Sequence, residues 1–180
     1  MLDATNLPIA LENTRLRLLS ELDADAYAAG TKDEAVRRFA HLPEPDYTPE
    51  SVRRMICDEV ATGLSSGTLA VLALADAETD RFVGSVVLFD VCSEAAEVGF
   101  WIHPGARGEG HAHRGLELAS RFARNSGLRT LTARTLPKNK ASQHCLTTAG
   151  FRETGRGVGT TPAGQREELF YYQRDLVTAA

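Results

Sequence analysis

A glycine-rich loop joins a strand-like apolar run to a helical pattern in residues 99–119, GFWIHPGARGEGHAHRGLELA. It contains Gly105, Gly108 and Gly110, with Arg107 among them. The backbone N–H groups of such a loop, at the N-terminus of a helix, form a binding site for anions. Glycines also let a phosphate approach the backbone closely. The segment therefore predicts a phosphate-binding loop, although a tight strand-to-helix turn would need the same glycines.

Two common phosphate motifs do not fit this loop. The Walker A pattern requires Gly-Lys-Ser/Thr after four intervening residues, and no such triplet follows the loop. A dinucleotide fingerprint that starts at Gly108 and Gly110 would need a third glycine at position 113, where His113 stands. The sequence thus disfavours both a nucleoside triphosphatase and a nicotinamide-binding protein.

The histidines near the loop, His103, His111 and His113, raise the alternative of a metal site. Side chains two positions apart on a helix point in different directions, so His111 and His113 do not form a ligand pair. We expect no metal, a backbone N–H contribution from His111, and positions at the surface or site edge for His103 and His113.

The apolar periodicity predicts elements on both sides of the loop. Ser20 and Asp23 suggest a capping box, and Thr48 followed by Pro49 suggests a second helix start. Before the loop we expect strand 14–20, helices 20–30, 33–43 and 48–63, a hairpin of strands 68–76 and 81–91, and strand 96–103. After it we expect helix 110–125, strand 128–136, helix 139–150, strand 151–157, a flexible turn 158–165 and strand 167–176. We also expect an ion pair between Glu117 and Arg121. This order predicts one α/β domain over residues 1–180, with a mixed sheet.

Composition excludes several classes of protein. The 180 residues are 43% hydrophobic, with 20 Lys+Arg against 24 Asp+Glu and a formal net charge of -4, which argues against a general nucleic-acid binder. Cys57, Cys92 and Cys145 are far apart and form no CxxC pair, so reduced thiols in a cytoplasm fit best. We expect no signal peptide, no transmembrane segment, and no nucleic-acid or membrane partner.

The loop matches a different pattern, Arg/Gln-x-x-Gly-x-Gly/Ala, over Arg107–Ala112. This pattern resembles the acyl-CoA-binding signature of the GNAT superfamily of N-acetyltransferases. The preceding Ile102-His103-Pro104 resembles the end of that family's fourth strand, and residues 139–151 resemble its second CoA motif. Residues 14–30 are similar to the start of the branch that acetylates ribosomal-protein N-termini.

The resemblance implies a fold and a co-substrate. The fold is a mixed, mostly antiparallel sheet of about six to seven strands flanked by helices, with splayed fourth and fifth strands. The co-substrate is acetyl-CoA. Its pyrophosphate would meet the backbone of Arg107, Gly108, Glu109, Gly110, His111 and Ala112. Its pantetheine arm would meet the backbone of Ile102 and His103 and the side chains of Asn139 and Ser142. Asn139 is equally suited to cap the following helix.

The catalytic groups follow from the same resemblance. Glu97 is the candidate base; strand alternation places it on one face with Gly99 and Trp101, although a surface charge paired with a neighbouring strand would look the same. Many members carry a tyrosine acid seven residues after the asparagine, where this chain has Leu146. Ser142 is therefore the candidate for contacting the sulfur. Cys145 fits a small core residue better than a nucleophile.

We therefore expect an acetyl-CoA-dependent N-acetyltransferase that acts by direct attack of a primary amine, either a protein N-terminus or a small amine. The acidic balance favours a cationic acceptor. Leu146 motivates the alternative, a non-catalytic acyl-CoA-binding or regulatory domain. Many members of the family form dimers, so the resemblance implies that this chain can form a homodimer.

Overall fold

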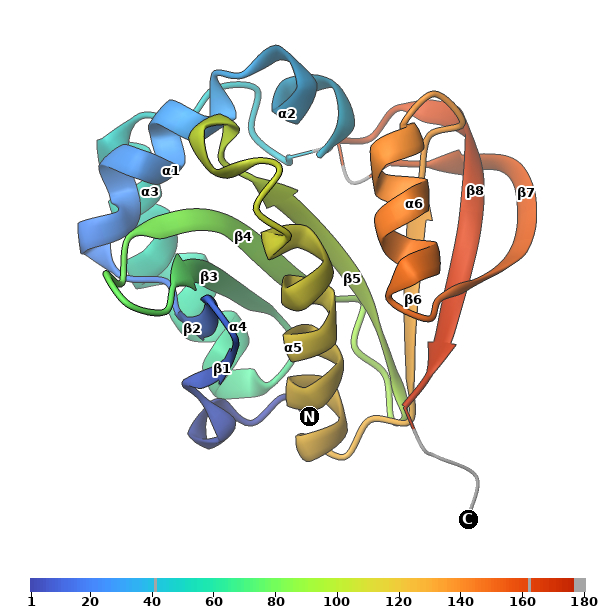
Figure 1. Ribbon diagram of the computed structural model, residues 1–180, viewed down its shortest axis with the longest axis horizontal. Coiled ribbons are helices and arrows are strands. Elements are labelled where there is room, and N and C mark those ends of the chain that lie inside the picture. The colour runs from blue at the N-terminus through green and yellow to red at the C-terminus, as the bar shows by residue number, and fades with distance from the viewer. Residues whose placement is uncertain (41, 162, 177–180) are drawn as a thin grey trace.

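The computed structural model describes residues 1–40, 42–161 and 163–176. Within these residues one eight-stranded sheet runs in the order β1-β2-β3-β4-β5-β6-β8-β7 (Figure 1). Neighbouring strands are antiparallel except β5 and β6, which are parallel. The strands are β1 Ile9–Leu11, β2 Thr14–Leu18, β3 Ala70–Asp76, β4 Phe82–Phe89, β5 Ala95–Ile102, β6 Thr130–Thr135, β7 Arg152–Thr160 and β8 Arg166–Asp175.

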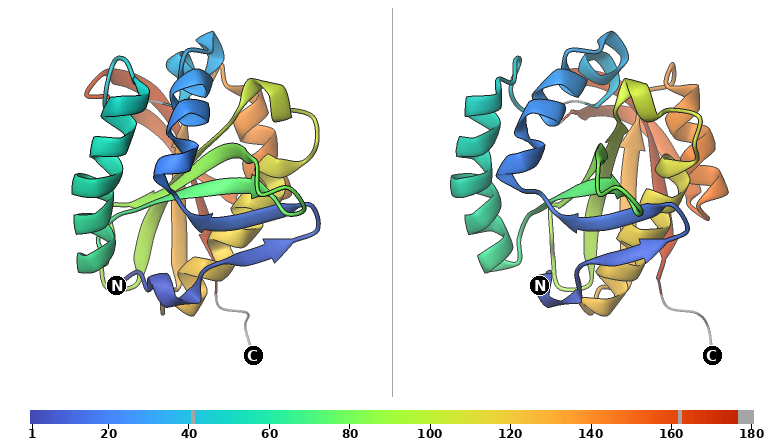
Figure 2. Two further views of the ribbon diagram at one scale, coloured as in Figure 1. Left: turned by 90° about the vertical axis from the view of Figure 1, so that its left-hand side faces the viewer. Right: turned by 60° about the vertical axis from the view of Figure 1, so that its left-hand side comes forward.

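Helices cover both faces of the sheet, with α1, α3 and α4 on one face and α5 and α6 on the other (Figure 2). The α-helices are α1 Ala24–Thr31, α2 Glu34–Phe39, α3 Pro49–Met55, α4 Ala61–Ser66, α5 His111–Asn125 and α6 Lys140–Thr148. A π-helical turn, Ile56–Val60, joins α3 to α4. None of the helices in the described part of the chain is long and apolar enough to cross a membrane.

The expected helix starts are confirmed. Ser20 and Asp23 form a capping box before α1, and Thr48 forms another with Ser51 at the start of α3. The expected helix end at Gly63 is wrong, because the helix continues to Ser66. A Cβ at Gly63 would lie 2.5 Å from the Leu69 side chain, so close packing explains that glycine. Gly67, at φ +68°, is the residue that ends the helix.

Two apolar cores lie on opposite sides of the sheet, and β5 contributes to both. Val98 packs with the residues buried against α5, whereas Trp101 packs with Tyr27 of α1 and Val52 of α3. This separation confirms the expected alternation along β5, because successive side chains of a strand point to opposite faces.

The pairing of β5 with β6 covers only the start of β5. The partners are Ala95 with Thr130, Ala96 with Leu131 and Glu97 with Thr132. Beyond Glu97 the two strands diverge, and Figure 1 shows them close at one end and spread at the other. The expected splay of the two strands is therefore confirmed.

Other expectations differ from the structure. Strand β1 was not predicted, and the described sheet has eight strands rather than about six to seven. Glu117 pairs with Arg174 of β8 at 2.7 Å, and the expected pair with Arg121 is wrong, because the sheet brings a guanidinium against this side of α5.

The expected helix 33–43 is shorter as α2, and its residue 41 lies outside the described residues. The expected turn 158–165 starts within β7, and its residue 162 also lies outside them.

Candidate active site

The gap between β5 and β6 exposes one edge of β5. The N–H of His103 donates to the Val83 carbonyl on the β4 side at 2.9 Å. Backbone groups of alternate residues in an antiparallel pair point to opposite edges, so those of Val98, Phe100 and Ile102 face the gap. The backbone of Ile102 is therefore placed to meet an extended ligand arm. The N–H of His103, which we expected to contribute, is already used by β4.

The loop before α5 has the shape of an anion cradle. Gly108 and Gly110 have φ values of +83° and +80°, which favour glycine. A Cβ at Gly108 would meet no atom within 4 Å, so open space lies over this part of the loop. The N–H of Arg114 is the first on α5 to bond back to a loop carbonyl, that of Gly110 at 3.2 Å. The amides of His111 and Ala112 precede it at the positive end of the helix dipole, so the residues present fit a pyrophosphate.

Arg107 anchors this loop to α2. Its guanidinium lies 2.6 Å from a carboxylate oxygen of Asp33, the N-cap residue of α2. The hydrogen bond from Arg107 holds the pKa of Asp33 below its ordinary value, against the smaller effect of burial. Asp33 was missed in the sequence because 74 positions separate the two residues. The side chain of Arg107 thus fixes the shape of the loop.

His111 has a structural role beyond its backbone N–H. Its side chain is fully buried, and its Nδ1 lies 2.8 Å from the Thr14 hydroxyl on β2. Arg114 donates to the same hydroxyl and to the Glu109 carbonyl, so the cradle is held against β2. No local pattern in the sequence indicates this contact, because 97 positions separate Thr14 from His111.

The remaining cradle residues and histidines lie nearer the surface. The carboxylate of Glu109 is half exposed and lies 3.4 Å from His111 Nε2, and Ala112 is half-buried. His113 is exposed, and His103 is half-buried with its Nδ1 accepting from the Gly105 N–H. Burial lowers the pKa of His103, assisted by the positive charges of Arg81 and Arg107. Within residues 1–40, 42–161 and 163–176, no group of three or more His, Cys, Asp or Glu side chains could hold a metal ion.

Helix α6 brings three residues to the other side of the gap: Asn139, Ser142 and Leu146. The Asn139 side chain accepts from the Ser142 N–H at 3.1 Å, so Asn139 caps the helix. The Ser142 hydroxyl makes no hydrogen bond to any residue that the structure describes and is free to bind a ligand. Leu146, at the position expected for a tyrosine acid, is buried and offers no proton. Cys145 beside it is half-buried and packs against the core, and burial raises its pKa.

Glu97 lies where β5 and β6 part, and it is paired with Arg134 of β6. The Arg134 Nε donates to Glu97 Oε1 at 2.7 Å, and the carboxylate is 15% exposed. Burial raises the pKa of Glu97 above its ordinary value, although Arg134 acts in the opposite direction. The neighbouring Asp90 raises it slightly further. Arg134 was missed in the sequence, because only the parallel pairing of β5 with β6 brings it beside Glu97.

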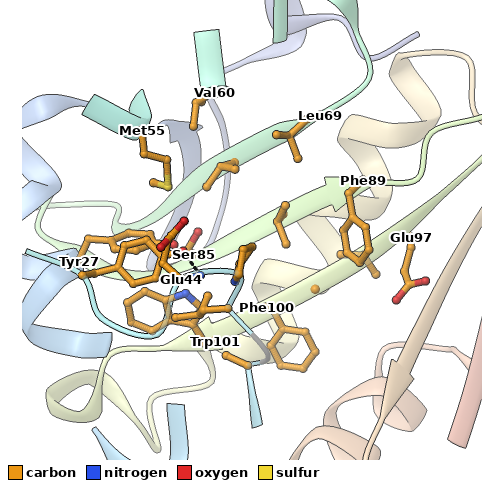
Figure 3. Close-up of a pocket in the computed structure, with 18 of the residues that line it drawn as sticks. Tyr27, Glu44, Met55, Val60, Leu69, Ser85, Phe89, Glu97, Phe100 and Trp101 are labelled. Carbon is orange, nitrogen blue, oxygen red and sulfur yellow. Dashed lines mark hydrogen bonds between the residues drawn. The ribbon is translucent and has the colours of Figure 1, made fainter. Parts of the chain in front are cut away.

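A cavity of about 520 Å³ connects these groups. Its lining includes Ser142 and Leu146 from the α6 side of the sheet, and Tyr27, Met55 and Trp101 from the side covered by α1 and α3. The cavity therefore reaches both faces of the sheet at the gap. Glu97 lies at one end of the group of residues drawn in Figure 3, with Tyr27 and Trp101 at the other. Such a volume accommodates a small organic ligand.

Comparison with known proteins identifies the family of this fold. The family model of the acetyltransferase (GNAT) domain matches residues 13–152. No curated protein matches the chain. Solved structures, however, share its fold.

Three of these structures illustrate the range of relatives. The ribosomal-protein-S5-alanine acetyltransferase from Vibrio fischeri is 16% identical, with a TM-score of 0.77 over 94% of this chain and 96% of that chain. Mycobacterium smegmatis RimJ in complex with CoA-disulfide is 19% identical, with a TM-score of 0.77 over 90% of this chain and 81% of that chain. Spermidine N-acetyltransferase from Vibrio cholerae, in complex with CoA and spermine, is 17% identical, with a TM-score of 0.76 over 91% of this chain and 96% of that chain. At these identities the likeness establishes a common fold.

Proposed function

The chain belongs to the GNAT acetyltransferase family, and from this premise we propose that it transfers an acetyl group from acetyl-CoA to a primary amine by direct attack. Acetyl-CoA, when bound, supplies an acetyl group activated as a thioester. The loop from Arg107 to Ala112 would hold its pyrophosphate through backbone N–H groups, and the open space over Gly108 supports this assignment. The free edge of β5 at Ile102 and the side chain of Asn139 would hold the pantetheine arm.

Glu97 is the base of the proposed reaction. An amine attacks only in its neutral form, so a proton must leave the ammonium group, and a carboxylate can accept it directly or through a water molecule. Burial raises the pKa of Glu97, which brings its basicity closer to that of the amine. The ion pair with Arg134 opposes this rise and favours the charged form of the carboxylate, which is the form that accepts a proton.

Ser142 is the group proposed to meet the sulfur of the leaving thiolate. Its hydroxyl lines the cavity and has no hydrogen-bond partner among the described residues. It can donate a hydrogen bond to a thiolate without giving up its proton. Because a thiol has an ordinary pKa near 8.5, the thiolate is an acceptable leaving group, and a water molecule can complete the protonation. Leu146 therefore does not prevent the reaction.

The acceptor is a primary amine, on a protein N-terminus or a small molecule. The names of the structural relatives cover both kinds: a ribosomal protein for one and spermidine for another. The observation that carries the proposal is the divergence of β5 and β6 directly beyond Glu97, which opens the cavity to both faces of the sheet.

The test combines CoA binding with a screen of amine and peptide acceptors. Titration calorimetry should detect CoA binding to the folded protein, and a thiol reagent should detect CoA release that depends on an acceptor. CoA binding with no acceptor-dependent release would favour the non-catalytic alternative. Absence of CoA binding to folded protein would reject both functions.

A further inference from the structure

The end of the cavity distant from Glu97 is an aromatic surface. Tyr27 lies 5.1 Å from Trp101 and 5.6 Å from Tyr47, measured between ring centroids. Trp101 is 7% exposed and lines the cavity. Its indole Nε1 is buried and makes no hydrogen bond of ordinary geometry within the described residues, although it lies close enough to the Tyr27 hydroxyl to lower the pKa of that group against the larger effect of burial. Buried donors are normally paired, so this one suits an oxygen acceptor on a ligand.

The walls between this surface and Glu97 are mostly apolar. Val71 of β3 and Val87 of β4 are among the apolar lining residues, and Met55 of α3 lies at the Tyr27 end. Glu97 and Trp101 share one face of β5 and are four residues apart, which corresponds to roughly 13 Å along a strand. An acceptor whose amine is near Glu97 therefore needs an extended apolar body to reach Trp101 (Figure 3).

The rim of the cavity is acidic. Four exposed carboxylates line it: Glu44, Asp46, Asp58 and Glu59. None of them forms an ion pair with a residue that the structure describes, and the basic lining residues are Arg54 and Arg134. Arg134 is already paired with Glu97. Such a rim attracts a cationic amine and opposes an acceptor that carries a carboxylate.

We propose that the acceptor is a small aromatic amine with no carboxylate and with an oxygen on its ring, and that Trp101 is the specificity-determining residue whose indole N–H donates to this oxygen. The proposal rests on the proposed transferase function. Tyramine is the simplest probe, since its ammonium and phenol groups lie at opposite ends of one aromatic body.

A comparison of kcat/KM among amine acceptors tests the proposal directly. We expect kcat/KM for tyramine to be about five times that for 2-phenylethylamine. We expect it to be at least fifty times the values for n-butylamine, spermidine and the zwitterion tyrosine. Comparable or higher values for n-butylamine, spermidine, tyrosine or an alanine-initiated peptide would overturn the substrate class. Equal values for tyramine and 2-phenylethylamine would overturn the role of the indole N–H. Each ranking requires turnover with some amine, so complete inactivity would count against the transferase function instead.

Binding can be followed without turnover, because Trp101 is the single tryptophan of the chain. Excitation at the red edge of tryptophan absorption, with CoA present, should give a saturable change in emission with tyramine and none with n-butylamine. The reverse order would contradict the proposal.

Two sets of variants separate the role of the Trp101 indole N–H from the role of the acidic rim. Trp101→Phe keeps an aromatic ring and removes the N–H, so it should abolish the preference for tyramine over 2-phenylethylamine while CoA affinity by calorimetry stays unchanged. Glu44→Gln with Asp58→Asn should raise the KM for tyramine about fivefold and weaken discrimination against tyrosine. Glu78→Gln, an exposed carboxylate in the β3–β4 turn, is the matched control and should change neither. Equal effects of the rim and control variants would overturn the role of the rim.

Discussion

The guanidinium of Arg134 on β6 donates to the carboxylate of Glu97, the last residue of β5 that pairs with β6. Immediately beyond this ion pair the strands separate and the cavity begins. Two opposing influences therefore act on the candidate base: burial raises its pKa, and Arg134 lowers it. Replacement of either residue should therefore change the pH dependence of activity in a predictable direction.

Replacement of Arg134 by Gln should raise the pKa of Glu97 further, because the attraction that lowers it is lost. A base must be deprotonated, so the acid limb of the kcat/KM profile should move to higher pH. Arg134→Lys, which keeps the positive charge, should move it less. An acid limb at the same pH in all three proteins would exclude Glu97 as the titrating base.

The same pair predicts how stability depends on pH. A carboxyl with a raised folded-state pKa favours folding below its ordinary pKa, and this contribution is lost as pH rises through the folded value. Thermal unfolding of Arg134→Gln should therefore show a larger fall in Tm from acid to neutral pH than unfolding of the wild-type protein. A smaller fall would contradict the assigned sign.

Glu97→Gln should lower kcat about 100-fold at pH values above the Glu97 pKa and below the amine pKa, in the range typical of a lost general base, and less at high pH. The difference should narrow because an exposed α-amine titrates near pH 8 and is increasingly neutral above it. The measurement is acetyl transfer across the pH range, with CoA affinity as the control that should not change. A profile parallel to that of the wild type would remove Glu97 from this role.

Gly108→Ala should raise the KM for acetyl-CoA about tenfold, because the added methyl group enters the open space over the cradle. Gly127→Ala is a closely matched control. Gly127 has a φ of +88° against +83° at Gly108, and at neither position would an added methyl group meet an atom within 4 Å. Both variants should lose about 1 kcal/mol of stability from backbone strain. Equal KM values would show that the loop is only a turn.

Asp33→Asn removes the charge that pairs with Arg107 but keeps a residue that caps α2 well. The KM for acetyl-CoA should rise about threefold as the loop loosens, and the free energy of unfolding should fall by less than about 1 kcal/mol, as expected for a partly exposed pair. Because the pKa of Asp33 is lowered in the folded state, its contribution is present above its ordinary pKa and is lost on acidification. The two proteins should therefore converge in stability at low pH.

Ser142→Ala should lower kcat about tenfold and leave Tm unchanged, because the hydroxyl makes no hydrogen bond to a described residue. Asn139→Ala should lower stability by about 1 kcal/mol through loss of the helix cap. Parallel kinetics and thermal unfolding of the two variants separate the roles. A loss of Tm in Ser142→Ala without a loss of kcat would assign the hydroxyl a structural role alone.

Local patterns in the sequence predicted most elements of this fold. The starts of α1 and α3 follow from side chains within three or four residues, and the alternation of Glu97, Val98 and Trp101 follows from strand geometry. The helix end assigned to Gly63 failed because the need for a glycine there arises from Leu69, a packing contact that the local pattern does not reveal. Strand β1 was missed because three residues are too few for a periodic signal.

The sequence by itself determined the family signature, the glycine loop before α5 and the face of β5 on which Glu97 lies, because each depends on residues close together in the chain. Tertiary structure alone decided that Arg134 pairs with Glu97, that Asp33 holds Arg107 and that Thr14 contacts His111. It also decided that Trp101 and the acidic rim face the same cavity as Glu97. The physical reason is that these contacts join residues distant in sequence, and only strand pairing and helix packing fix which of many compatible partners meet.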